Sequence, residues 1–203
     1  MKILALMPCY KIMEVPAVQS LCALQADVYS RNDNMHIVFA NGFNAPMART
    51  SLYLYAVEKA GEVDWVLNLD SDHIYSAKAL YSLIEIATEK NLPLLSATYF
   101  VRGMPKKTAH GRYVEDGKFE KFKEEELNGE LMEADVLGFG FLLMRQSFIK
   151  QMVEKYDRDI FHMDAHHNGD EAVYFCKKAQ DLGHKMLFDP NNKVGHLTTV
   201  VNV

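Results

Sequence analysis

Short apolar runs alternate with longer segments of helical periodicity through the first hundred residues. The apolar runs have the length and composition of buried strands, and we assign four strands to them: Ile3–Met7, 35–41, 64–70 and 92–100. Between these runs apolar side chains recur every three to four positions, which predicts three helices: Val15–Tyr29, Ala45–Ala60 and Ala77–Glu89. Strand–helix units in succession predict an α/β fold with a mostly parallel central sheet flanked by helices.

The second half of the chain has a less regular pattern. Residues 102–130 are polar, charged and interrupted by glycine, which indicates a small substrate-facing insertion with room for a short hairpin. The apolar run Phe141–Met144 predicts a strand that continues into a helix. A second helix is expected within 169–185, ended by Gly183, and a last short strand at 185–190.

Composition narrows the class of protein. The 203 residues suit one domain, and 49% apolar with 24% charged residues suits a globular core. A net charge of −5 argues against general binding to nucleic acid or anionic membranes. Three cysteines without a CxxC pair are typical of reduced thiols, and no apolar stretch approaches the ~20 residues of a membrane span. We therefore expect a cytoplasmic protein without a transmembrane segment; its oligomeric state stays open.

The strand expected at 64–70 ends in Asp70, Ser71 and Asp72, with no glycine or proline to form an ordinary turn. One interpretation is structural, because aspartate caps helices well and a helix follows near Ser76. The other is chemical: carboxylates at the end of a strand can hold Mg²⁺ or Mn²⁺ against a phosphate, with Asp72 as the direct ligand. The first two strands end at the same edge with Pro8, Cys9, Tyr10 and Asn41.

Two basic or titratable residues are further candidates for a site at this edge of the sheet. The imidazole of His196 can complete a metal site begun by carboxylates if the tail folds back, although an isolated histidine is often a core or surface residue. Arg49, at the start of the second expected helix, is either a cation near a diphosphate or a solvated arginine.

Residues 138–140 and 170–171 complete the candidates. Asp170 or Glu171 can serve as a general base, although the helix dipole also favours acidic residues at a helix start. Gly138 and Gly140, on either side of Phe139, permit either close approach of a ligand or a tight turn.

The segment 161–170 contains His162, Asp164, His166, His167 and Asp170. The first two histidines are four residues apart, as in a helical zinc pair. Asn168 and Gly169 interrupt such a helix and the HExxH pattern is absent, so a loop that lines a substrate pocket is the favoured interpretation.

Taken in order, these segments resemble the GT-A fold of glycosyltransferases that use a nucleotide-sugar donor. The likeness covers most of the chain: PCY, MAR before LDSD, the strand after LGFG, then DEAVYFCKKAQDLGHK and VGH. Small proteins of this kind occur in bacteria, bacteriophages and large DNA viruses, including capsid-glycosylating enzymes of algal viruses. The resemblance implies one GT-A domain over 1–203, with a nucleotide-binding half (1–100) and an acceptor-binding half (101–203), in the host cytoplasm if the protein is viral.

The resemblance also implies roles for matching positions. The donor base would lie among residues at the first two strand ends: Pro8, Cys9, Tyr10 and Asn41. The DxD element and a late histidine would hold Mn²⁺ or Mg²⁺: Asp70, Ser71, Asp72 and His196. Gly138, Phe139 and Gly140 would border the donor sugar, and Asp170 or Glu171 the acceptor hydroxyl. A UDP-sugar is the default donor, and a glycan or glycoprotein the acceptor.

Two departures from the family pattern affect the mechanism. Thr50 follows Arg49 where related chains often have asparagine, and Glu171-Ala172 stands where an acidic pair is usual. The base therefore stays open between Asp170 and Glu171, as does inverting against retaining transfer. Alternatives are a non-catalytic nucleotide- or carbohydrate-binding module and a nucleotidyltransferase, although PCYKIMEVP lacks the glycine of a phosphate loop. The end at TTVVNV is compatible with one domain of a longer polypeptide.

Overall fold

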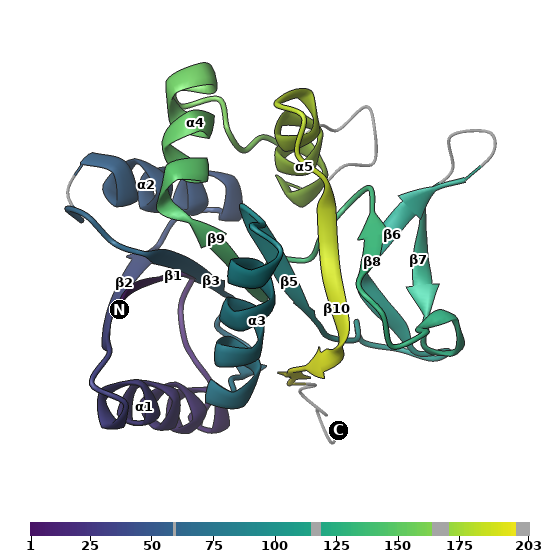
Figure 1. The fold of residues 1–203 in the computed structure, drawn as a ribbon, viewed down its shortest axis with the longest axis horizontal. Coiled ribbons are helices and arrows are strands. Elements are labelled where there is room, and N and C mark those ends of the chain that lie inside the picture. Colours follow the sequence, from purple (N-terminus) through teal and green to yellow (C-terminus); the bar gives the residue numbers. More distant parts are fainter. Residues whose placement is uncertain (59, 115–118, 164–170, 198–203) are drawn as a thin grey trace.

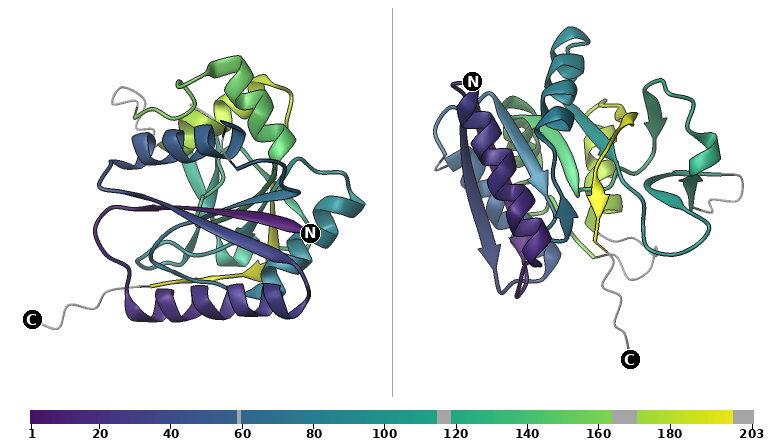
Figure 2. Two further views of the ribbon diagram at one scale, coloured as in Figure 1. Left: turned by 90° about the vertical axis from the view of Figure 1, so that its left-hand side faces the viewer. Right: turned by 90° about the horizontal axis from the view of Figure 1, so that it is seen from below.

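Alternate side chains of the first strand enter two separate cores. Leu4 and Leu6 belong to one cluster of buried apolar side chains, whereas the intervening Ala5 belongs to another. Successive side chains of a strand point to opposite faces of a sheet, so this strand has a core on each side. The computed structural model, which describes residues 1–58, 60–114, 119–163 and 171–197, accordingly has helices on both faces of a central sheet (Figures 1 and 2).

The elements have the following bounds. The helices are α1 (Val15–Ser30), α2 (Ala45–Glu58), α3 (Ala77–Glu89), α4 (Gln146–Tyr156) and α5 (Glu171–Asp181), with a short 3-10 helix at Glu124–Glu126. The central sheet contains β1 (Lys2–Cys9), β2 (Asn34–Asn41), β3 (Trp65–Leu69), β5 (Leu94–Thr98), β8 (Met132–Ala134), β9 (Phe141–Arg145) and β10 (Met186–Lys193). Two smaller sheets pair β4 (His73–Ile74) with β11 (Gly195–His196), and β6 (Lys107–Tyr113) with β7 (Phe119–Lys123).

The helices divide between the two faces of the sheet. Buried side chains of α2, α4 and α5 share one core with the sheet, and those of α1 and α3 share the other. The division is visible in Figure 1, where α2 and α4 lie above the sheet and α1 lies below it. None of the helices in the described part of the chain is long and apolar enough to cross a membrane.

The seven strands follow the order β2-β1-β3-β9-β5-β10-β8. β1 pairs in parallel with β2 and β3, and β10 with β5, whereas β9 is antiparallel to both β3 and β5. Five strands therefore run in one direction, and only β8 and β9 oppose them. The predicted α/β fold with a mostly parallel sheet is confirmed. β9 lies between β3 and β5, which correspond to the third and fourth strands expected from the sequence.

The segment after β3 forms a turn at Ser71 and Asp72, but neither aspartate caps the helix that follows. Ser76, and neither aspartate, caps α3, because its side chain accepts a hydrogen bond from the N–H of Ala79 at 3.3 Å. Instead, Asp70 and Asp72 lie between β3 and β4, at the edge of the sheet where β1 and β2 also end. The capping interpretation of the two aspartates is therefore wrong.

His110 attaches the insertion to the central sheet. The expected hairpin is present as β6 and β7, and the His110 side chain of β6 is fully buried. Its Nδ1 accepts from the N–H of Gly138 at 3.1 Å, so its Nε2 carries the proton and donates to the carbonyl of Ala97 at 3.0 Å. Its ring stacks on Phe188, with ring centres 4.3 Å apart. Burial lowers the pKa of His110 to about 3.

The low pKa of His110 predicts a pH-dependent stability. Between about pH 6.5 and 3, an unfolded histidine binds a proton that the folded one does not, so stability falls as the pH falls. One such group contributes up to about 1.4 kcal/mol per pH unit. Urea unfolding at pH 7 and pH 5 should show a steeper loss for the wild type than for His110→Gln, which cannot titrate. Equal slopes for the two proteins would rule out this role.

Candidate functional site

The last described strand returns to the edge of the sheet that carries the aspartates. β11 pairs antiparallel with β4, which places His196 opposite His73. The N–H of Leu197 then donates to the carbonyl of Asp72 at 2.8 Å. This short pairing brings together Asp72 and His196, which lie 124 residues apart in the sequence.

His196 lies between two hydrogen-bond acceptors. Its Nδ1 lies 3.0 Å from the carbonyl oxygen of Phe100, which can only accept, so Nδ1 carries a proton. Its Nε2 lies 3.2 Å from Oδ2 of Asp72, and only the protonated ring can donate there. The hydrogen bond to Asp72 accordingly raises the pKa of His196. When His196 is neutral, Nε2 has a free lone pair on the side of Asp72 and can bind a cation that Asp72 also contacts.

His73 fixes the other oxygen of the Asp72 carboxylate. Its Nδ1 donates to Oδ1 of Asp72 at 3.0 Å, while its buried ring stacks on His196 with ring centres 4.6 Å apart. Its Nε2 has no hydrogen-bond partner among the described residues. Burial raises the pKa of Asp72, but hydrogen bonds from His196 and His73 more than offset this and hold it below its usual range. Asp72 is therefore a carboxylate at neutral pH.

The atoms around Asp72 suit a divalent cation. Among the described residues, ligand atoms of Asp72, His73 and His196 all lie within 4.8 Å of one another. Adjacent ligands of an octahedral Mg²⁺ lie about 3 Å apart, and Oδ2 of Asp72 lies 3.2 Å from Nε2 of His196. Asp72 and His196 of the predicted ligand set thus fit a divalent cation, with His73 orienting Asp72 through its second oxygen. Asp70, the third predicted ligand, lies outside this group and is paired with Arg49.

Arg49 occupies the centre of the site and is almost fully buried, with 5% of its surface exposed. One terminal nitrogen donates to Oδ1 of Asp70 at 2.7 Å, and Nε donates to Oε1 of Glu171 at 3.3 Å. The guanidinium also lies over the ring of Phe139, 4.9 Å from its centre. The interpretation of Arg49 as a solvated residue is therefore wrong. Its other terminal nitrogen, NH1, has no partner among the described residues.

Two hollows meet at Arg49, Asp70 and Asp72, which line both. The outer crevice, of about 450 Å³, is bordered by further residues of the strand ends and of the segment that leads into α2, among them Pro8, Tyr10, Phe43, Asn44 and Ser71. The inner pocket, of about 230 Å³, is bordered by Gly138, Phe139, Glu171, Ala172 and His196, among others. The same three charged side chains therefore line both cavities.

Some predicted residues lie beside these hollows without lining them. Cys9 and Asn41 face each other in register at the ends of β1 and β2, outside the described lining of the outer crevice. Gly140 lies beneath His73, and a Cβ at this position would come within 2.3 Å of the His73 Nε2. Asp170 lies outside the described residues, so Glu171 is the base candidate whose surroundings the structure defines.

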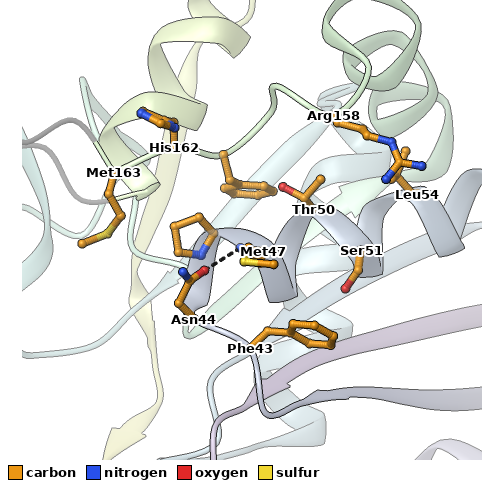
Figure 3. Close-up of a pocket in the computed structure, with 11 residues that line it drawn as sticks. Phe43, Asn44, Met47, Thr50, Ser51, Leu54, Arg158, His162 and Met163 are labelled. Carbon is orange, nitrogen blue, oxygen red and sulfur yellow. Dashed lines mark hydrogen bonds between the residues drawn. The ribbon is translucent and has the colours of Figure 1, made fainter.

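A third hollow, the apolar pocket, opens between α2 and the segment that follows α4 (Figure 3). It measures about 470 Å³ and shares Phe43 and Asn44 with the outer crevice. His162 lines it, whereas the histidine four residues later lies outside the described part of the chain. The described residues of its lining include no carboxylate, so the apolar pocket offers no acidic ligand for zinc.

Several residues of the site were not candidates in the sequence. His73 and Arg102 both contact Asp72, and Tyr99 packs against His73 with ring centres 4.4 Å apart. His73 directly follows the DSD triplet, which is the one signal that could have identified it. Tyr99 belongs to the expected fourth strand and Arg102 to the polar segment after it, and nothing in their spacing indicates the contacts.

Comparison with known proteins identifies the fold. No family model and no curated protein sequence matches the chain. Among solved structures, A197 from STIV is similar, with a TM-score of 0.61 and 14% identity over 100% of this chain and 97% of that one. The catalytic domain of Drosophila beta1,4galactosyltransferase 7, in a complex with xylobiose, gives a TM-score of 0.55 and 15% identity over 98% of this chain and 71% of that one.

A third similar structure is S. aureus TarS 1-349, with a TM-score of 0.57 and 16% identity. The match covers 98% of this chain but 60% of TarS 1-349, so the chain spans only part of that protein. At these identities the likeness concerns the fold. It confirms the predicted GT-A fold.

The packing of His73 against Gly140 predicts a destabilising substitution. Gly140→Ala places a methyl group against the buried His73 ring, and such overpacking typically costs about 1–3 kcal/mol. Urea unfolding should show this loss in the wild-type background. In a His73→Ala background the same substitution should cost much less, because the clashing ring is gone. An equal cost in both backgrounds would mean that the two residues do not interact.

Proposed function

We propose that the chain is a metal-dependent glycosyltransferase that transfers a sugar from a nucleoside-diphosphate sugar, most simply a UDP-sugar, to a hydroxyl of a glycan or glycoprotein acceptor. The observation that carries this proposal is the pairing of Asp72 with His196 at the carboxyl ends of the parallel strands in a GT-A fold. Ligands of open α/β sheets bind at this edge.

The two hollows suit the two ends of a nucleotide-sugar. The outer crevice has room for the nucleotide, with Tyr10 exposed at its rim to stack on a base and Pro8 beside it. Asp72 and His196 would hold Mg²⁺ or Mn²⁺ where the diphosphate passes between the hollows. When bound, the cation supplies Lewis-acid stabilisation of charge on the departing nucleoside diphosphate. Gly138 and Phe139 would then border the sugar in the inner pocket.

Glu171 is positioned to act as a general base. Oε1 of Glu171 accepts from Arg49, and the residue lines the inner pocket. In an inverting transfer, the acceptor oxygen attacks C1, its proton passes to the Glu171 carboxylate, and the bond from C1 to the diphosphate oxygen breaks. Arg49 keeps Glu171 beside Asp70, and so beside the donor. Asp170 is the alternative base, and a retaining transfer would not need a base at this position.

A binding module is the second candidate function, and Ala172 is the observation that favours it. Ala172 lines the inner pocket where related chains usually have a carboxylate. A chain that only binds nucleotide or carbohydrate would release no free sugar from a nucleotide-sugar. Donor hydrolysis by the purified protein therefore separates the two functions.

The proposed cation site predicts metal-dependent nucleotide binding. Calorimetric titration with UDP, GDP and dTDP, each with Mn²⁺ and with EDTA, should show one nucleotide that binds only with metal. Asp72→Asn removes a charged ligand and should weaken Mn²⁺-dependent binding by about tenfold or more, since affinity follows the charge of the ligands. Asp27→Asn, at an exposed position of α1, is the control and should bind like the wild type. Full metal-dependent binding by Asp72→Asn would sink the cation assignment.

The proposed base predicts a separable effect on turnover. Glu171→Gln retains an oxygen that can accept from Arg49 but cannot take up a proton. Release of free sugar from the preferred donor should fall by about 10²- to 10⁴-fold, while nucleotide binding stays unchanged. Glu89→Gln, exposed at the end of α3, serves as the control. If Glu171→Gln keeps wild-type turnover, Asp170 or a retaining mechanism replaces this assignment.

A further inference from the structure

Asp72 has a third side-chain partner besides His73 and His196. Arg102, in the segment after β5, donates from one terminal nitrogen to Oδ2 of Asp72 at 3.1 Å. This is the same oxygen that faces Nε2 of His196 at 3.2 Å. A guanidinium therefore lies against the carboxylate oxygen that a divalent cation would use.

Arg102 also holds the returning C-terminal segment. Its Nε and the same terminal nitrogen donate to the carbonyl of Leu197, at 3.2 and 3.0 Å. Leu197 in turn donates its N–H to the carbonyl of Asp72. One side chain thus connects the segment after β5, the loop that carries Asp72 and the strand that carries His196.

The exposure of Arg102 allows it to leave. Half of its side-chain surface is exposed, against 6% for Arg49 on the neighbouring Asp70. An exposed ion pair contributes little to stability, whereas a buried one is costly to break. The two aspartates therefore differ. Asp70 is paired with the buried Arg49, which stays in place, whereas Asp72 is paired with the exposed Arg102, which another cation can displace.

We infer that Arg102 is the resident counter-cation of Asp72 and competes with the divalent cation for Oδ2, so that it sets the affinity of the metal site. This inference rests on the proposed cation site at Asp72 and His196. A positive guanidinium and a divalent cation on one carboxylate oxygen repel each other, so the cation binds as Arg102 withdraws. Arg102 is a positioning residue in this account, because it acts through Asp72 and touches no reacting atom.

The test is Mn²⁺ binding to the purified protein without nucleotide, followed by electron paramagnetic resonance of the free ion. Arg102→Gln should bind Mn²⁺ about tenfold more tightly than the wild type at low salt, because a unit positive charge beside the ion is removed. The difference should shrink at higher salt, since the pair is half exposed. Circular dichroism of each variant verifies that the fold is retained.

Two further variants identify the cause. Arg112→Gln removes an arginine of similar exposure, paired with Glu126 in the insertion, and should leave Mn²⁺ affinity unchanged. Arg102→Lys keeps the charge but cannot hold Asp72 and Leu197 with a fork of donors, and should bind Mn²⁺ within about twofold of the wild type. If Arg102→Lys tightens binding as much as Arg102→Gln, the contact with Leu197 is responsible and the competition is refuted.

The outcomes separate this inference from the proposed function. Binding of Mn²⁺ by the wild type, with Arg102→Gln unchanged or weaker, overturns the role of Arg102 and leaves the cation site in place. Absence of Mn²⁺ binding by both the wild type and Arg102→Gln, without nucleotide and also with saturating UDP, GDP or dTDP, overturns the cation site itself, and with it the premise of the competition.

Discussion

A buried guanidinium is the constraint on which the site depends. A charge removed from water is costly unless it is paired, and Arg49 is paired twice, with Asp70 after β3 and with Glu171 at the start of α5. These contacts fix α2, β3 and α5 relative to one another across 122 residues of sequence. The ring of Phe139 beneath the guanidinium completes its surroundings. Arg49 and Asp70 line both hollows, and Glu171 lines the inner one.

This pairing gives the two aspartates of the DSD triplet different environments. Asp70 is bound by a buried arginine, whereas Asp72 is surrounded by three donors that differ in burial: His73, His196 and Arg102. His73 is held in place by Gly140 and fixes one carboxylate oxygen, which leaves the other for partners that can exchange. A rigid support on one oxygen and replaceable partners on the other is the arrangement that a cation site needs.

Much of the fold was readable from periodicity, because long amphipathic helices and buried strands repeat their apolar pattern many times. The position of β9 was not, since pairing between distant strands leaves no local pattern, and the two-residue strands β4 and β11 are too short to have one. Gly138 and Gly140 were recognised as positions for close approach. Their close neighbours within the protein are the side chains of Tyr99, Ala109 and His73, and such packing cannot be read from the glycines alone.

The sequence by itself determined the α/β class and predicted which strand ends would bring Pro8, Tyr10, Asp70 and Asp72 together at one edge of the sheet. Hydrophobic burial and strand direction suffice for these, because both follow from local patterns. Only the tertiary structure decided that Arg49 is buried between two carboxylates and that His196 returns to Asp72 while His73 supports it. Those contacts depend on exact distances between charges brought together by the whole fold, and a charged residue looks the same in a sequence whether it is paired or solvated.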